Sequence, residues 1–137
     1  MAIDHGSRRI GLAIGDTATG IASPLKTIQA AGNPRADAAA VLAQALQFDV
    51  DAFVVGLPLN MDGTEGPQAK TTQVFGEALA EASGKPVHYW DERLSSFTAE
   101  ELIQGEELTR KKKRSRVDRL AAQIILQEFL AHQSAQN

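Results

Sequence analysis

The fold is decided by the stretch Ile3-Asp4-His5-Gly6-Ser7-Arg8-Arg9-Ile10-Gly11-Leu12-Ala13, which joins two apolar segments, residues 1–6 and 10–15. Its connection, residues 6–9, is short and contains glycine, as the turn of a β-hairpin should. Aspartate is disfavoured inside strands, so Asp4 is either a turn residue or a residue kept for its chemistry. The stretch predicts a β-hairpin that carries a carboxylate.

Outward from this hairpin, the pattern predicts three strands, a helix, a strand, a helix, a strand and further helices. Pro24 places the third strand, residues 21–28, at a sheet edge. Pro34 opens the first helix, and Gly84 follows the second, which is expected over about residues 68–83. The remaining expectations are strands at 52–57 and 86–90 and helices near 98–104 and over about 115–132.

This order predicts an α/β fold of one domain spanning residues 1–137. Its mixed five-stranded sheet would have three hairpin-connected strands and then two parallel strands, because helical crossovers join parallel strands. The apolar run at 52–57 is typical of a strand covered on both sides. We therefore expect helices on both faces of the sheet.

Composition excludes several classes of protein. The chain has no cysteine, which rules out disulfides and thiolate metal sites, and its three histidines are scattered. A bound metal would therefore sit on carboxylates, which suits magnesium or manganese. The sequence shows neither a membrane-length apolar stretch nor a secretory signal, so we expect a cytoplasmic protein without membrane contact.

Positive charge is concentrated in one run, although the net charge is −3. Six of its seven residues are basic: Arg110, Lys111, Lys112, Lys113, Arg114 and Arg116. Such a run can attract a polyanion to an otherwise acidic body. The alternative is a solvated charged loop.

Acidic residues from distant segments are the candidates for chemistry. Asp91 and Glu92 end the fifth strand and point to opposite faces, so at most one can join Asp4. Asp118 shares the apolar arc of the last helix with residues 121, 122, 125 and 129, so it should face the sheet. A buried carboxylate needs a partner, which could be Arg116, Arg119 or a metal ion shared with Asp4.

Four motifs, in order, resemble the YqgF/RuvX family of Holliday-junction-resolvase-like nucleases. They are residues 3–13, the loop Val55-Gly56-Leu57-Pro58-Leu59-Asn60-Met61-Asp62-Gly63-Thr64-Glu65, the segment Trp90-Asp91-Glu92-Arg93-Leu94-Ser95-Ser96, and Lys113-Arg114-Ser115-Arg116-Val117-Asp118-Arg119-Leu120-Ala121-Ala122. Together they span nearly the whole chain. The family usually has more residues before the first aspartate, a smaller or apolar residue at His5, and threonines in place of Ser95 and Ser96.

The resemblance implies a ribonuclease H-like fold and a metal-dependent nuclease. Its substrate would be the 5′ end of the small-subunit (16S) ribosomal RNA precursor or, by analogy, branched DNA such as a Holliday junction. The implied catalytic acids are Asp4, Asp118 and one of Asp91 and Glu92, with Glu92 favoured, and Asp4, Glu92 and Asp118 would hold Mg²⁺ or Mn²⁺. The implied contacts to nucleic acid are Arg8, Arg9, Arg93 and the basic residues of the run from Arg110 to Arg116.

Two other functions compete with this interpretation. A phosphotransferase or ATPase of the actin and sugar-kinase kind shares the sheet topology, but it needs a second domain for which 137 residues leave no room. A non-catalytic nucleic-acid-binding module would have lost the acids, whereas all of them are present. The sequence does not choose between RNA and DNA as substrate, or between cutting within a strand and cutting from its end. It also does not choose between a monomer and a homodimer.

Overall fold

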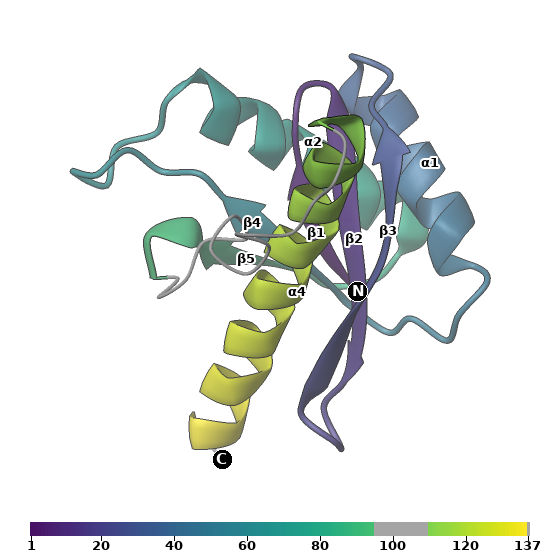
Figure 1. Cartoon of the computed structure of the whole chain (residues 1–137), viewed down its shortest axis with the longest axis vertical. Coiled ribbons are helices and arrows are strands. Elements are labelled where there is room, and N and C mark those ends of the chain that lie inside the picture. The colour runs from purple at the N-terminus through teal and green to yellow at the C-terminus, as the bar shows by residue number, and fades with distance from the viewer. Residues whose placement is uncertain (95–109, 137) are drawn as a thin grey trace.

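The computed structural model describes residues 1–94 and 110–136, and Figure 1 shows a sheet with helices packed against it. The strands are β1 (Ala2–His5), β2 (Arg9–Asp16), β3 (Ile21–Gln29), β4 (Phe53–Leu57) and β5 (Val87–Asp91). The helices are α1 (Pro34–Ala45), α2 (Pro67–Ser83), the 3-10 turn η1 (Glu92–Leu94) and α4 (Arg110–Gln136).

The five-stranded sheet has the order β3-β2-β1-β4-β5. β1 pairs antiparallel with β2 and β2 antiparallel with β3, whereas β4 pairs parallel with both β1 and β5. The predicted mixed sheet of three hairpin-connected strands followed by two parallel strands is therefore confirmed. Pro24 lies in β3, which is an edge strand as expected.

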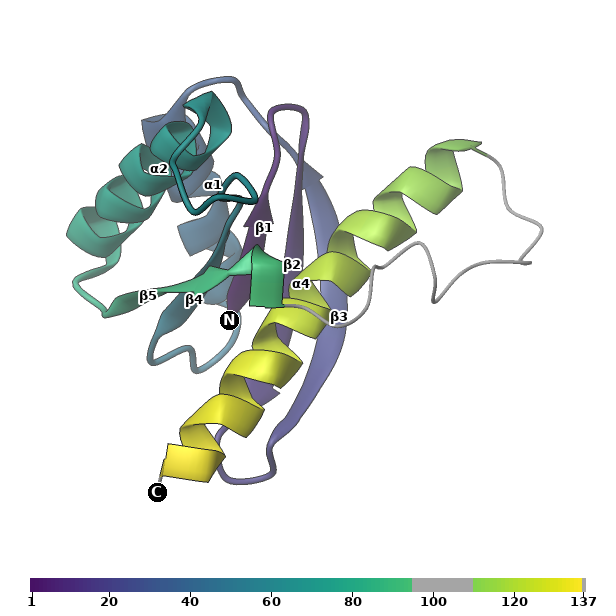
Figure 2. The ribbon, with the colours of Figure 1, turned by 90° about the vertical axis from the view of Figure 1, so that its left-hand side faces the viewer.

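Helices cover both faces of this sheet. α1 and α2 lie together on one side and α4 crosses the other, as Figure 2 shows. Asn33 caps α1 by accepting hydrogen bonds from two backbone N–H groups, and Gly84 ends α2 in the left-handed conformation (φ 69°). Both ends agree with the sequence prediction.

The two sides of the sheet are packed with residues of different size. The side under α1 and α2 holds large side chains, among them Ile3, Leu12 and Phe75, each of which stabilises the fold by about 1.5–3 kcal/mol through burial. On the side under α4 the strands contribute mainly small residues, among them Ala2 and Ala13, while the large buried side chains come from α4 itself. Small side chains let the backbone of α4 approach the strands closely.

The last helix begins earlier than predicted. The sequence indicated a start near Ser115 with the basic run before it, but α4 begins at Arg110, so residues 110–116 form its first two turns. Lysine and arginine are good helix formers, and no glycine or proline interrupts the segment, so the charged run continues the helix. The helix predicted near residues 98–104 lies outside the described residues.

A buried polar link sits behind β1, on the α1 and α2 side. His5 Nε2 lies 3.0 Å from Asp37 Oδ2, and the His5 ring stacks on Phe75 with centroids 4.3 Å apart. The other oxygen of Asp37 accepts a 2.7 Å hydrogen bond from the backbone N–H of Ala31. The link ties β1 to the start of α1.

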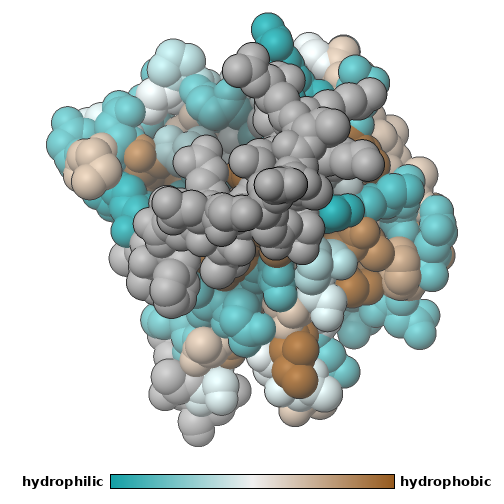
Figure 3. Space-filling model, in the orientation of Figure 1, coloured by the Kyte–Doolittle hydropathy of each residue, from teal (hydrophilic) through white to brown (hydrophobic). Residues whose placement is uncertain are grey.

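The surface on the α4 side is mostly hydrophilic where Figure 3 shows described atoms, with small apolar areas between them. Within residues 1–94 and 110–136, no helix combines the length and the apolar character needed to cross a membrane.

Candidate active site

Strand alternation sends Asp4 toward α4. Its neighbour Ile3 belongs to the core under α1 and α2, whereas Ala2 belongs to the core under α4, and side chains alternate along a strand. Asp4 is paired in register with Gly11 of β2, and Ile3 with Val55 of β4. The Asp4 carboxyl group therefore lies near the middle of the sheet, partly buried beneath α4.

Glu92 reaches the same face from η1, directly after β5. Trp90, two residues earlier, packs on the α4-side core and meets Phe129 edge to face at 6.2 Å. Glu92 continues this alternation, and its Oε1 lies over Gly56 of β4, where an added Cβ would come within 2.6 Å of that oxygen. Glu92 lies close enough to Asp4 for the two carboxyl groups to affect each other's pKa.

Asp91 instead pairs with Arg93. The Arg93 guanidinium donates from Nη2 to Asp91 Oδ2 at 2.6 Å and from Nε to the same oxygen at 3.0 Å. This pairing keeps the pKa of Asp91 below its ordinary value. Arg93 also donates from Nη1 to the carbonyl oxygen of Met61 at 3.2 Å, which ties the end of β5 to the loop after β4. Of the two acids that the sequence left open, Glu92 is the one beside Asp4.

Asp118 approaches from α4, as its place in the apolar arc predicted. Its backbone carbonyl packs directly on Gly11, where a Cβ would overlap the oxygen. Its side chain is 18% exposed and accepts a hydrogen bond at Oδ2 from Arg9 Nε at 2.5 Å. Sequence reasoning missed this partner because Arg9 lies 109 residues away.

The pKa of Asp4 is raised by burial and by the two other acids. Burial raises it most, and the charges of Glu92 and Asp118 raise it further, to about 8. Burial also raises the pKa of Glu92. Asp4 and Glu92 therefore form a carboxyl pair that holds a proton at neutral pH, because two adjacent carboxylates repel each other when both are ionised.

The acids offer oxygen ligands of the kind that a divalent cation prefers. Among residues 1–94 and 110–136, no three acidic or histidine side chains are gathered as ligands of a single ion. Asp4 and Glu92 are in contact, whereas Asp118 lies close enough to act on Asp4 by charge but is paired with Arg9. Mg²⁺ is usually held by one or two carboxylates together with water and phosphate, so Asp4 and Glu92 fit such an ion, with Asp118 held beside them by Arg9.

Two groups of basic candidates adjoin the acids along the chain, one in the β1–β2 turn and one at the start of α4. Arg8 is exposed in the β1–β2 turn, next to Arg9. The basic run, residues 110–116, leads along α4 to Asp118, and in Figure 2 the first turns of this helix project past the sheet. The structure describes the backbone of this run and not its side chains.

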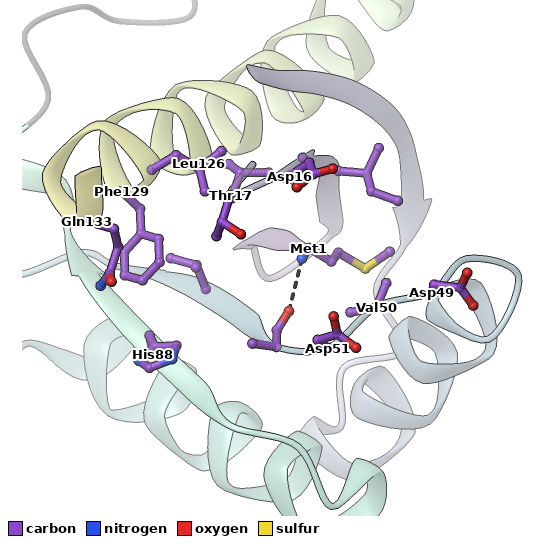
Figure 4. A pocket seen from close by; sticks show the side chains of 15 residues that line it. Met1, Asp16, Thr17, Asp49, Val50, Asp51, His88, Leu126, Phe129 and Gln133 are labelled. Carbon is purple, nitrogen blue, oxygen red and sulfur yellow. Dashed lines mark hydrogen bonds between the residues drawn. The ribbon is translucent and has the colours of Figure 1, made fainter. Parts of the chain in front are cut away.

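A separate cavity of about 410 Å³ carries none of the candidate acids. Figure 4 shows its walls, to which Met1, Asp16, Asp51, His88 and Phe129 contribute. The cavity lies beside the start of β4. Glu92, in contrast, follows the last residue of β5. We therefore place the candidate active site at the acids and not in the cavity.

Glycines beneath α4 were also missed by sequence reasoning. An added Cβ would meet the backbone of Asp118 at Gly11, the Leu126 and Leu130 side chains at Gly15, and the Ile125 side chain at Gly56. A glycine inside an apolar strand is a known sign of close backbone approach, and this signal could have located the crossing helix.

Comparisons with known proteins extend these observations. The family model described as RuvX, Holliday junction resolvase, matches residues 1–132. A relative from Beijerinckia indica is 44% identical over 130 residues, covering 95% of this chain and 78% of its own length. A relative from Anaeromyxobacter sp. is 42% identical over 130 residues, covering 95% of this chain and 94% of its own length. Both are provisionally named pre-16S rRNA nuclease.

Among solved structures, Thermus thermophilus RuvC in complex with a Holliday junction substrate matches with a TM-score of 0.57 and 16% identity. The match covers 96% of this chain and 92% of that chain. A second structure of the same protein matches with a TM-score of 0.54. These likenesses concern the fold alone and confirm the expected ribonuclease H-like architecture. Because the family model spans almost all of the sequence and the relatives exceed 40% identity, the chain belongs to the RuvX family of nucleases.

Proposed function

We propose that this chain is a metal-dependent nuclease that matures the 5′ end of the 16S rRNA precursor, with Asp4, Glu92 and Asp118 as its catalytic acids and metal ligands. The observation that carries the site is the meeting of three acids from distant segments: the charges of Glu92 and Asp118 both act on the buried Asp4 carboxyl group. Asp91 is left out of the acid set because Arg93 engages it.

The raised pKa of Asp4 supports a cation at this place. A buried pair of carboxyl groups costs free energy when both are ionised, and a nearby divalent cation reverses that cost. When bound, Mg²⁺ or Mn²⁺ supplies a hydroxide nucleophile near neutral pH and stabilises the leaving oxygen of the phosphodiester. Asp4 and Glu92 must give up their shared proton before both can act as ligands.

The basic residues would hold the substrate. Arg8, exposed in the β1–β2 turn, and the run over residues 110–116, which precedes Asp118 on α4, would bind phosphates without reading the base sequence. Arg93 is hydrogen-bonded to Asp91 and to the carbonyl of Met61. It is therefore better placed to hold the loop after β4 than to bind a phosphate. A one-domain protein acting in the cytoplasm suits this reaction.

The names of the relatives support an RNA substrate. The RNA assignment is tested by incubating the purified protein and Mn²⁺ with a 16S precursor fragment and, in parallel, with a four-way DNA junction. We expect cleavage of the RNA near the mature 5′ end. Cleavage of the junction alone would overturn the RNA assignment.

The role of the acids is tested by substitution. Asp118→Asn should abolish cutting of either substrate, whereas Asp49→Asn, on an exposed loop beyond α1, should cut at the wild-type rate. Undiminished cutting by Asp118→Asn would remove that residue from the site. Mn²⁺ binding is also measured by calorimetry in the wild type and in Asp4→Asn. If the protein binds the RNA and the substitution removes no Mn²⁺ binding, the chain is a non-catalytic binding module.

A further inference from the structure

Arg9 takes a place among the acids that simple phosphate binding does not require. Its Nε donates to Asp118 Oδ2 at 2.5 Å, and its side chain is 36% exposed while that of Asp118 is 18% exposed. A hydrogen bond between a guanidinium and a carboxylate is charge-assisted, which makes it stronger than one between neutral groups. The guanidinium therefore occupies one of the proposed metal ligands.

The backbone on both sides of this pair is firmly placed. Arg9 opens β2 and lies two residues before Gly11, so both residues project toward α4. Asp118 is held over the sheet by the contact of its carbonyl with Gly11. The Arg9 side chain itself is long and more than a third exposed, so it can leave Asp118 without disturbing the core.

Electrostatics gives this arrangement a consequence. Asp118 repels Asp4, which already has Glu92 beside it. A positive guanidinium on Asp118 offsets part of that repulsion, as a metal ion would. The guanidinium engages Asp118 Oδ2, and its positive charge repels any metal ion that approaches the same carboxylate, so Arg9 and a metal compete for Asp118.

We propose that Arg9 is a built-in counter-ion that holds Asp118 in the metal-free protein, competes with the metal for it, and binds a substrate phosphate once displaced. This inference rests on the proposed function, in which Asp118 is a metal ligand. A planar guanidinium suits both partners, because its paired N–H groups match carboxylate and phosphate oxygens alike. Arg9 thus acts on metal binding through Asp118, as a positioning residue, and contacts the substrate phosphate directly.

The test separates this role from simple support of Asp118. Mn²⁺ binding is titrated by calorimetry, without nucleic acid, in the wild type and in Arg9→Gln. Removing a competitor should tighten Mn²⁺ binding by about two- to fivefold, the range that a partly exposed ion pair is worth. A residue that merely oriented Asp118 would have the opposite effect, so weaker or unchanged Mn²⁺ affinity in Arg9→Gln overturns the proposal.

Two further variants control for charge and folding. Arg35→Gln removes the same charge from an exposed position on α1, on the other side of the sheet, and should leave Mn²⁺ affinity unchanged. Arg9→Lys retains a competing cation and should bind Mn²⁺ close to the wild-type affinity. If Arg35→Gln raised the Mn²⁺ affinity as much as Arg9→Gln does, the change in net charge would explain the result and the proposal would be overturned.

The substrate half of the proposal has its own measurement. With Ca²⁺ present at saturation, binding of a 12-nucleotide single-stranded RNA should weaken in Arg9→Gln by about threefold or more, as expected for one lost charge-assisted contact. Unchanged RNA affinity would refute this half. If the wild type binds no divalent ion at all, the proposed function falls as well, whereas wild-type Mn²⁺ binding that Arg9→Gln leaves unaltered refutes the competition alone.

Discussion

Stability of the metal-free protein should fall as pH rises through neutrality, because of Asp4. Its pKa is about 8 in the folded protein against an ordinary value of 3.8, so between these values the folded state keeps a proton that the unfolded chain has released. Stability decreases with pH wherever the folded state binds more protons. One fully retained proton lowers the free energy of unfolding by about 1.4 kcal/mol for each unit by which the pH rises. This loss should level off above pH 8.

Urea unfolding in EDTA at pH 5.5, 6.5 and 7.5 would measure this slope. The informative quantity is the difference between the wild type and Asp4→Asn, because the amide carries no titrating proton and every other group is shared by the two proteins. We expect the wild type to lose up to about 1.4 kcal/mol more per unit than Asp4→Asn.

Asp49→Asn, at an exposed position, is the matched control and should follow the wild type. Equal slopes in the wild type and Asp4→Asn would refute the shared proton at this site. Saturating Mn²⁺ should flatten the wild-type slope as well, because the cation takes the place of the proton.

Three further perturbations follow from the structure. Gly11→Ala would drive a Cβ into the carbonyl of Asp118, so α4 must shift; we expect a loss of about 1–3 kcal/mol in urea unfolding and weaker Mn²⁺ binding by calorimetry. Asp37→Ala would leave buried His5 Nε2 unpartnered and should cost about 1–3 kcal/mol, whereas a thermal midpoint equal to the wild type would contradict this. Replacing Lys111–Lys113 by alanine should lower the salt dependence of RNA binding by about one unit of slope per lost phosphate contact, and an unaltered slope would return the run to a merely solvated segment.

Local rules predicted most of the fold. Pro24 marked an edge strand, Asn33 and Pro34 marked the start of α1, and Gly84 marked the end of α2, because each acts through its own backbone geometry or hydrogen bonding. The predicted start of α4, near Ser115, was wrong because the dense run of positive charge was interpreted as a segment that precedes the helix. Side-chain repulsion is a small cost in a helix whose other half is buried against a sheet.

The candidate site was predicted in part. The three acids could be named from sequence, but alternation counted from Asp91 alone could not choose between it and Glu92. That choice depends on Trp90, which packs under α4 against Phe129 and so turns Glu92 to the same side. The pair between Arg9 and Asp118 spans most of the chain, and no local pattern announces such a contact.

The glycines under α4 also bear on how much change the protein can accept. At Gly11 the helix rests on main-chain atoms, so the spacing between Asp118 and the strands is set by a contact that has no side chain to vary. Swapping one large residue for another beneath α1 and α2 would alter stability on the far side of the sheet while leaving that spacing intact. We expect the catalytic geometry to be insulated from mutational drift in the main core and vulnerable to a single added methyl group at the crossing.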